Sequence, residues 1–329
     1  MSAAGGKDIA ALASVVVPCV FVYQHTMRRS MILHAPTSSR RCFIRHSFLA
    51  VGAAALPTVA WATPDASVPI WTVRKRGRSV YLLGETLPRP QAWHVPAVEA
   101  LLLRCGKLWT ETNQTYREST AALVKRFGMS ASPSPLGLLS PSQESRLERA
   151  AVSAKVNLAE FVGIRPWLVG ATLEDAGYNA FGLTGASANT VLSAQAKNAG
   201  IPLASEFATK DDVFSWFGGM SPIQETQFLC FAVDGVLLGR DGCERLSRSW
   251  LAGRIAPVEA FVEYERRSYP ELYMKLTADR NLAWVRRFEA MLDEPKPTMV
   301  VVGLYHLVGP NSLLAKLREA DFTVSKGIY

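Results

Sequence analysis

TMVVVGLYHLVG, residues 298–309, indicates the fold class because a short apolar run ends at a glycine and is followed by a histidine. The run from Met299 to Val302 is too short for a helix and is rich in β-branched side chains. It therefore predicts a strand buried on both faces of an α/β sheet. Gly303 lets the chain leave the sheet tightly. His306 then lies beyond the carboxyl end of the strand, where open α/β sheets usually bind ligands.

The rest of the chain predicts where the other strands and helices lie. Further strand-like segments occur near the N-terminal end of the folded part, at 70–73 and 79–84, while the middle is mostly helical. Two helix starts, at Ser140 and Ser221, each have a serine cap, a proline next and a glutamine three residues after the cap. The pattern predicts an α/β (α+β) fold whose central mixed β-sheet is built from N- and C-terminal segments, with a large helical middle region.

Five landmarks resemble the TraB/GumN family, which includes the Tiki metalloproteases, and they occur in the family's order between Ile70 and Tyr329. Each motif is weak by itself, but the ordered set identifies the chain as similar to that family. The landmarks are the hairpin at 70–84, the strand ending in Glu111, the strand ending in Glu206, the helix with Arg280-Asn281, and the segment from Gly303 to His306.

One family motif is altered in this chain. The family has two Gly-x-x-His motifs, proposed to act with a glutamate as a metal site. The second motif, at 303–306, is intact, but the first reads Gly84-Glu85-Thr86-Leu87. Leucine cannot bind a metal, so the resemblance implies a divalent-metal site, of unknown metal, that is impaired or lost.

The resemblance also implies roles for particular residues. Glu111, Arg280 and His306 are the candidate catalytic residues, and His306 and Glu111 are the candidate metal ligands. The candidate cleft-lining residues are Glu85, Glu206, Gly84 and Gly303.

Other side chains are candidates to replace the missing histidine, because catalytic zinc usually has three protein ligands and an open position. Glu85 lies on the same strand-end turn, although it would point differently from the fourth motif position. His94 is close in sequence, but it precedes Pro96 at an expected helix start, where a surface or capping role is commoner.

Two hypotheses for function follow. In the first, the protein is an exported, peptidase-like, metal-dependent hydrolase with an impaired metal site, in which Arg280 anchors an anionic group or transition-state charge. In the alternative, the same fold binds a small molecule or peptide without catalysis, and Arg280 forms an ion pair with one of the glutamates. Leu87 favours the second hypothesis, whereas the retained Glu111, Arg280 and His306 favour the first.

The N-terminal residues predict export. Residues 39–45, SRRCFIR, match the twin-arginine pattern and precede an apolar stretch at 48–59 and a small-residue end at Ala60-Trp61-Ala62. We expect cleavage after Ala62, transport by the twin-arginine export machinery, and a periplasmic or otherwise exported protein of a bacterial cell. Residues 1–62 are thus the export signal with an upstream extension, and 63–329 form one TraB/GumN-like domain. The apolar stretch is too short for a stable membrane span.

Charge and cysteine content limit the partners. The chain has a net charge of +8, and residues 1–62 contribute six basic residues and one acid, or +5, which leaves +3 for residues 63–329. So small a basic excess gives no reason to expect a nucleic-acid partner.

Three cysteines follow residue 62, and we expect buried thiols at Cys105, Cys230 and Cys243, although pairing of the last two stays open.

Overall fold

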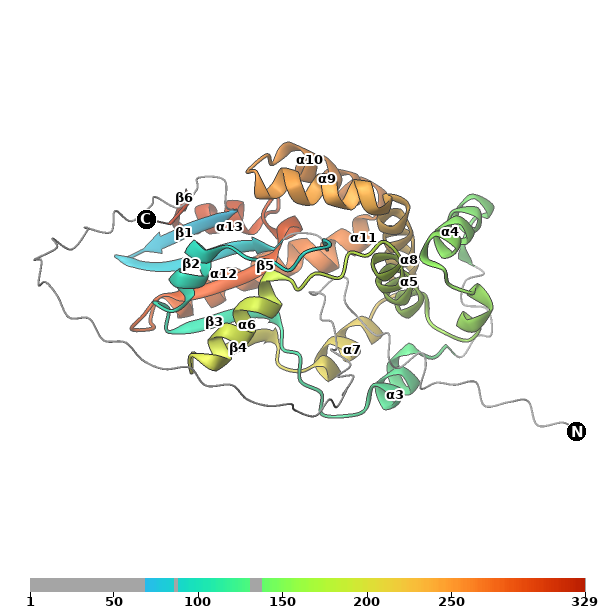
Figure 1. Cartoon of the computed structure of the whole chain (residues 1–329), viewed down its shortest axis with the longest axis horizontal. Helices are drawn as coiled ribbons and strands as arrows, with labels where there is room; N and C mark the ends of the chain where they lie inside the picture. The colour runs from blue at the N-terminus through green and yellow to red at the C-terminus, as the bar shows by residue number, and fades with distance from the viewer. Residues whose placement is uncertain (1–68, 86–87, 131–137, 329) are drawn as a thin grey trace, which may run out of the picture. The chain divides into compact units, whose positions relative to one another are not determined.

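The strand expected at Met299–Val302 is β5 (Thr298–Gly303), and it lies inside a six-stranded sheet of order β4-β3-β5-β2-β1-β6 (Figure 1). The other strands are β1 (Ile70–Lys75), β2 (Arg78–Glu85), β3 (Lys107–Thr112), β4 (Leu203–Phe207) and β6 (Thr323–Lys326). Strands β2, β5, β3 and β4 are parallel neighbours, whereas β1 is antiparallel to both β2 and β6. The predicted mixed sheet of N- and C-terminal segments is confirmed, with one strand, β4, contributed by the middle of the chain.

The computed structural model describes residues 69–85, 88–130 and 138–328. The export signal, the predicted domain start at residue 63, and Thr86 and Leu87 of the altered motif lie outside the described residues. Within the described part of the chain, no helix is long and apolar enough to cross a bilayer.

Helices make up most of the rest of the described chain, and the predicted helical middle region is confirmed. Ser140 and Ser221 each cap a helix through a reciprocal pair of bonds with the glutamine three residues later, as their sequence patterns predict. The α-helices are α2 (Pro96–Leu102), α3 (Thr120–Leu123), α4 (Pro141–Ala154), α5 (Pro166–Ala180), α6 (Ala188–Asn198), α7 (Lys210–Gly218), α8 (Pro222–Leu237), α9 (Gly239–Leu251), α10 (Ala256–Ser268), α11 (Pro270–Tyr273), α12 (Asp279–Met291) and α13 (Leu313–Glu319). The short π and 3-10 segments are η1 (Val124–Gly128), η3 (Leu158–Phe161), η4 (Met274–Ala278) and η5 (Leu304–His306).

The sheet is covered on both faces, and strand β5 shows why its sequence is apolar throughout. Val300 and Val302 point to one face, where they pack with α12 and α13. Met299 and Val301 point to the other face, against α2 and α6. A strand buried on both faces must carry apolar side chains at every position.

A second apolar core lies within the helical region, among α4, α5, α7 and α8. Its centre is Trp167 of α5, which is fully buried and whose ring centroid is 5.7 Å from that of Phe214 and 5.4 Å from that of Phe217. The three described cysteines are buried and free, so the expected thiols are confirmed and Cys230 and Cys243 are not paired.

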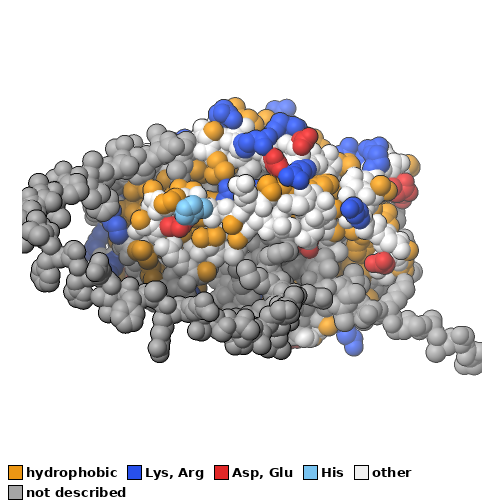
Figure 2. All heavy atoms as spheres, in the orientation of Figure 1, with side chains coloured by type: hydrophobic (Ala, Val, Ile, Leu, Met, Phe, Trp, Pro, Cys, Tyr) orange, Lys and Arg blue, Asp and Glu red, His pale blue; other side chains and the backbone are white. Residues whose placement is uncertain are grey.

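Basic side chains on the surface alternate with acids. In Figure 2 the lysines and arginines gather mainly along the top of the view, where α9 and α10 lie in Figure 1. On α9, Arg240 and Arg248 both pair with Glu244, and on α10 Arg266 and Arg267 both pair with Glu263. These helices therefore present a mixed surface rather than a uniformly basic one.

Candidate functional site

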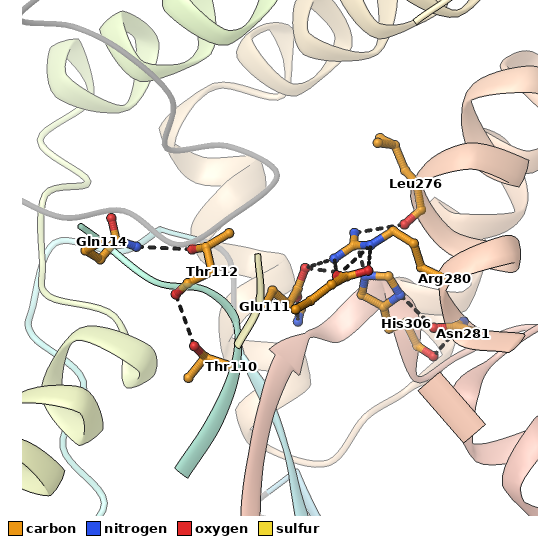
Figure 3. Close-up of polar contacts among 10 residues, drawn as sticks. Thr110, Glu111, Thr112, Gln114, Leu276, Arg280, Asn281 and His306 are labelled. Atoms are coloured by element: carbon orange, nitrogen blue, oxygen red, sulfur yellow. Dashed lines mark hydrogen bonds and ion pairs between the residues drawn. The ribbon is translucent and has the colours of Figure 1, made fainter. Parts of the chain in front are cut away.

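The candidate residues come from the carboxyl ends of parallel strands. Glu111 and Glu206 lie near the ends of β3 and β4, and His306 follows β5 in the short segment η5. Because parallel strands end at the same edge of a sheet, these side chains meet there. Arg280, at the start of α12, points toward Glu111 and His306 (Figure 3).

Arg280 contacts all three of the other residues in this strand-end cluster, which are Glu111, Glu206 and His306. Its Nη2 donates to Glu111 Oε2 at 2.7 Å and to Glu206 Oε2 at 2.6 Å, and its Nε donates to Glu206 Oε2 at 3.0 Å. Its Nη1 donates to the carbonyl oxygen of Leu276 at 3.0 Å. Arg280 is 4% exposed and Glu111 2% exposed, so this is a buried ion-pair network in which one cation serves two carboxylates.

Aromatic rings surround the guanidinium. The Arg280 Cζ atom lies 4.9 Å from the ring centroid of Trp284, 5.7 Å from that of Trp216 and 5.8 Å from that of Phe207. A planar, weakly hydrated guanidinium suits such surroundings better than an ammonium group would. The rings and the two carboxylates together hold Arg280 in one place.

His306 is fully buried and held by the residue that follows Arg280. Its Nδ1 is 2.7 Å from Asn281 Oδ1, while Asn281 Nδ2 donates to the carbonyl oxygens of His306 at 3.3 Å and Asn311 at 2.8 Å. Because the Asn281 amide nitrogen already donates to two carbonyls, the Asn281 amide oxygen faces the imidazole and accepts a hydrogen bond from His306 Nδ1–H. Burial lowers the pKa of His306, although Glu111 acts to raise it. The ring is therefore neutral at pH 7, with the Nε2 lone pair facing the Arg280 guanidinium at 3.3 Å.

Glu111 stays ionised despite its burial. Burial by itself would raise its pKa, but the Arg280 guanidinium and a hydrogen bond from the Gly303 backbone lower it, to about 2. That bond runs from Gly303 N to Glu111 Oε1 at 2.6 Å. A Cβ atom at residue 303 would come within 2.7 Å of the Tyr305 ring, so glycine is needed for the backbone to lie this close to that ring.

Glu85 lies at the same sheet edge but is bonded elsewhere. Its Oε1 accepts from the Asn189 backbone at 3.0 Å, and its buried Oε2 has no hydrogen-bond partner among the described residues. Burial raises the pKa of Glu85 to about 7, and the nearby charge of Glu111 adds to this.

Gly84 is covered by Trp250, whose Nε1 donates to the Gly84 carbonyl at 3.2 Å and whose ring leaves no space for a Cβ. Gly84 therefore serves close packing next to Glu85.

The described residues do not fit a metal ion as they are arranged. The Arg280 guanidinium lies against both candidate ligands, with Nη1 3.3 Å from His306 Nε2 and Nη2 2.7 Å from Glu111 Oε2. A zinc ion would need ligand distances of about 2 Å in the same space, and it would meet a fixed positive charge there. Among the residues that the structure describes, no group of three or more His, Cys, Asp or Glu side chains is placed to hold a metal.

His94 does not replace the missing ligand. Its side chain is 70% exposed and its Nδ1 is 2.8 Å from Glu99 Oε1. It lies two residues before α2, which begins at Pro96, so the surface role expected from the sequence is confirmed.

Sequence reasoning missed the role of Asn281. The residue was visible only as part of the Arg280-Asn281 pair, and nothing in the sequence indicated that it bonds to His306. The one available signal is a polar pair at the start of a helix whose other inward positions, such as Trp284 and Phe288, are apolar.

Fold and site together define an α+β protein in which the ends of parallel strands hold a buried cluster of charged side chains. The model of the TraB/PrgY/gumN family matches residues 69–326, and the chain belongs to that family. The match confirms the resemblance noted in the sequence. No curated protein and no solved structure matches the chain.

Proposed function

We propose that this protein is an exported member of the TraB/PrgY/gumN family that binds a small molecule or peptide and uses no metal ion at its strand-end cluster. One observation carries the proposal. The Arg280 guanidinium contacts both Glu111 Oε2 and His306 Nε2, the two atoms that a metal shared by these residues would need. Leu87, in place of a histidine in the first motif, supports the same proposal.

The electrostatics of the cluster also support it. Glu111, with a pKa near 2, is an anion already paired with Arg280, so it is a poor proton acceptor near neutral pH. His306 is neutral, fully buried and bonded to Asn281. Both groups are therefore engaged in holding the structure, and a ligand would be recognised beside them rather than transformed by them.

A zinc titration followed by calorimetry tests the proposal. We expect no stoichiometric binding by the wild-type chain at neutral pH, because zinc would have to displace Arg280 from two carboxylates. His306→Ala should give the same trace as wild type. His94→Ala, which alters an exposed histidine, reveals any weak surface binding. Tight zinc binding that His306→Ala abolishes and His94→Ala preserves would overturn the proposal.

The second candidate function is a peptidase-like, metal-dependent hydrolase with an impaired metal site. The observation that favours it is the closeness of His306 Nε2 and Glu111 Oε2, 3.6 Å apart, at an edge that also carries the buried carboxyl group of Glu85. The pKa values of Glu85, about 7, and Glu111, about 2, differ in the way that acid and base carboxylates often do. This function requires Arg280 to move away from Glu111. A stoichiometric zinc site in the titration would favour it and justify a screen for peptide hydrolysis.

Export is tested separately. The double change Arg40→Lys, Arg41→Lys is expected to abolish transport to the periplasm, because the twin-arginine machinery requires that pair, and precursor should accumulate in the cytoplasm. Cell fractionation and the intact mass of the product are the measurements, and wild type should give a chain that begins after Ala62. Arg28→Lys, Arg29→Lys is the matched control. Unchanged transport of the first variant would refute the export proposal.

A further inference from the structure

A cavity of about 40 Å³ lies among the helices beside the charged cluster. It shares two residues with the surroundings of that cluster, Leu276, whose carbonyl accepts from Arg280, and Tyr305, which precedes His306. Its walls come from α5, α8, α9, α10 and the two short segments η4 and η5. The acidic, aromatic and thiol side chains that line it include Glu174, Phe231, Cys243, Phe261, Glu265 and Tyr305.

Glu265 is a buried carboxylate at this cavity with no hydrogen bond or ion pair to its side chain in the described part of the chain. It is 2% exposed, and it lines the cavity from α10. Burial raises its pKa to about 8, and no described neighbour offsets that effect. An acid that burial keeps mostly uncharged and that has no hydrogen-bond partner has lost the hydrogen bonds it would make to water, so its position beside an open volume points to a cationic ligand that would pair with its ionised form.

The remaining walls match a positively charged ligand with an apolar body. Glu174, 4% exposed, supplies a second carboxylate, which accepts from the Tyr178 hydroxyl at 2.5 Å. Phe231, Phe261 and Tyr305 supply ring faces that attract cations. No lysine, arginine or histidine is among the described residues that line the cavity. The described lining is thus acidic and aromatic, and it offers no cationic side chain to attract an anion.

The volume limits the size of the group that enters. A buried water needs roughly 10–15 Å³ of such space, so 40 Å³ admits a head group of a few atoms. We infer that this cavity binds a primary alkylammonium group, with its charge on the carboxylates of Glu174 and Glu265 and its alkyl chain against Phe231 and Phe261. The inference rests on the proposed binding function and names the class of ligand that the protein takes.

Calorimetric titration of the mature chain with hexylammonium chloride at neutral pH tests this inference. We expect saturable binding of one molecule per chain. Hexanol, which lacks the charge, and hexanoate, which reverses it, should bind at least about tenfold more weakly. Equal binding of hexylammonium and hexanol would show that only apolar contact is involved and would overturn the inference.

Two variants locate the binding in the cavity. Glu265→Gln keeps the side-chain shape but cannot ionise to pair with the ammonium group, so we expect a folded protein with at least about tenfold weaker hexylammonium binding. Glu271→Gln, at an exposed position on the following helix α11, should leave the affinity unchanged. Gly235→Leu directs a side chain toward Glu174, whose Oε1 would lie 3.5 Å from the added Cβ atom, and should block the cavity.

The outcomes separate this inference from the proposed function. No saturable hexylammonium binding, or binding that Glu265→Gln leaves unchanged, would overturn the alkylammonium site while a negative zinc titration still supported a metal-free binding protein. A stoichiometric zinc site would instead overturn the proposed function, whatever the amine titration gave.

Discussion

Arg280→Met is expected to lower the free energy of unfolding by about 3–5 kcal/mol, the usual cost of removing one partner from a buried ion pair. Methionine fills much of the same volume, but it leaves the carboxylates of Glu111 and Glu206 without their cation. The measurement is urea-induced unfolding at pH 7, followed by circular dichroism. Arg286→Met, at an exposed position on the same helix, is the control and should change the free energy by less than about 0.5 kcal/mol.

A compensating variant separates charge from packing. Adding Glu111→Gln and Glu206→Gln to Arg280→Met removes the uncompensated charges, so part of the lost stability should return. If Arg280→Met proved no more destabilising than Arg286→Met, the guanidinium would not be the centre of the cluster. If the triple variant were less stable than Arg280→Met, the loss would come from packing around Trp284 rather than from unpaired charge.

Stability should fall steeply in acid because of Glu111. Its pKa is lowered from 4.5 to about 2 in the folded state, so its contribution is fully present above about pH 4.5 and is lost as the pH falls toward 2. A shift of this size corresponds to about 3 kcal/mol, at 1.36 kcal/mol for each pKa unit. Urea unfolding at a series of pH values from 7 to 2 measures it.

Comparing wild type with Glu111→Gln tests whether the loss of stability in acid comes from Glu111. The variant is expected to be less stable than wild type at pH 7, because it loses the pair with Arg280, and the difference should shrink as the pH falls below 4.5. Glu271→Gln, at an exposed position, should follow wild type throughout. A difference between wild type and Glu111→Gln that stays constant from pH 7 to pH 2 would contradict the lowered pKa.

Much of the fold could be predicted because its signals are local. The short apolar run at 299–302, rich in valine, indicates a strand because it is too short for a helix. The Ser-Pro-x-Gln patterns at Ser140 and Ser221 indicate helix starts through bonds within four residues. The strand β4, by contrast, has a half-exposed sequence and joins the sheet only because β3 pairs with it. Propensity alone could not have placed it, and the expected strand ending in Glu206 came from the family resemblance.

The site was only partly predictable because its contacts are not local. Glu111 and His306 were identified through family motifs, but Arg280 and Glu111 are 169 positions apart in the chain, and only the folded sheet edge brings them together. For Arg280 the sequence left two roles open, an anchor for an anionic group and an ion pair with a glutamate. The structure shows ion pairs with both Glu111 and Glu206.

The cavity beside the cluster had no sequence signal at all. Glu174 and Glu265 lie on helices α5 and α10, where acids usually mark a solvated face. Their burial follows from how α5, α8, α9 and α10 pack around them, which is a tertiary effect. Buried carboxylates of this kind are found from a structure, and their sequence spacing does not reveal them.

The most direct test of the central claim, that Arg280 serves as the resident cation of the strand-end cluster, is the metal content of the mature chain purified without chelators and measured by elemental mass spectrometry. Wild type, His306→Ala and His94→Ala are compared at neutral pH. We predict far less than one metal ion per chain in all three proteins, because the Arg280 guanidinium already contacts both Glu111 and His306. Near-stoichiometric metal in wild type and His94→Ala, lost in His306→Ala, would contradict this claim.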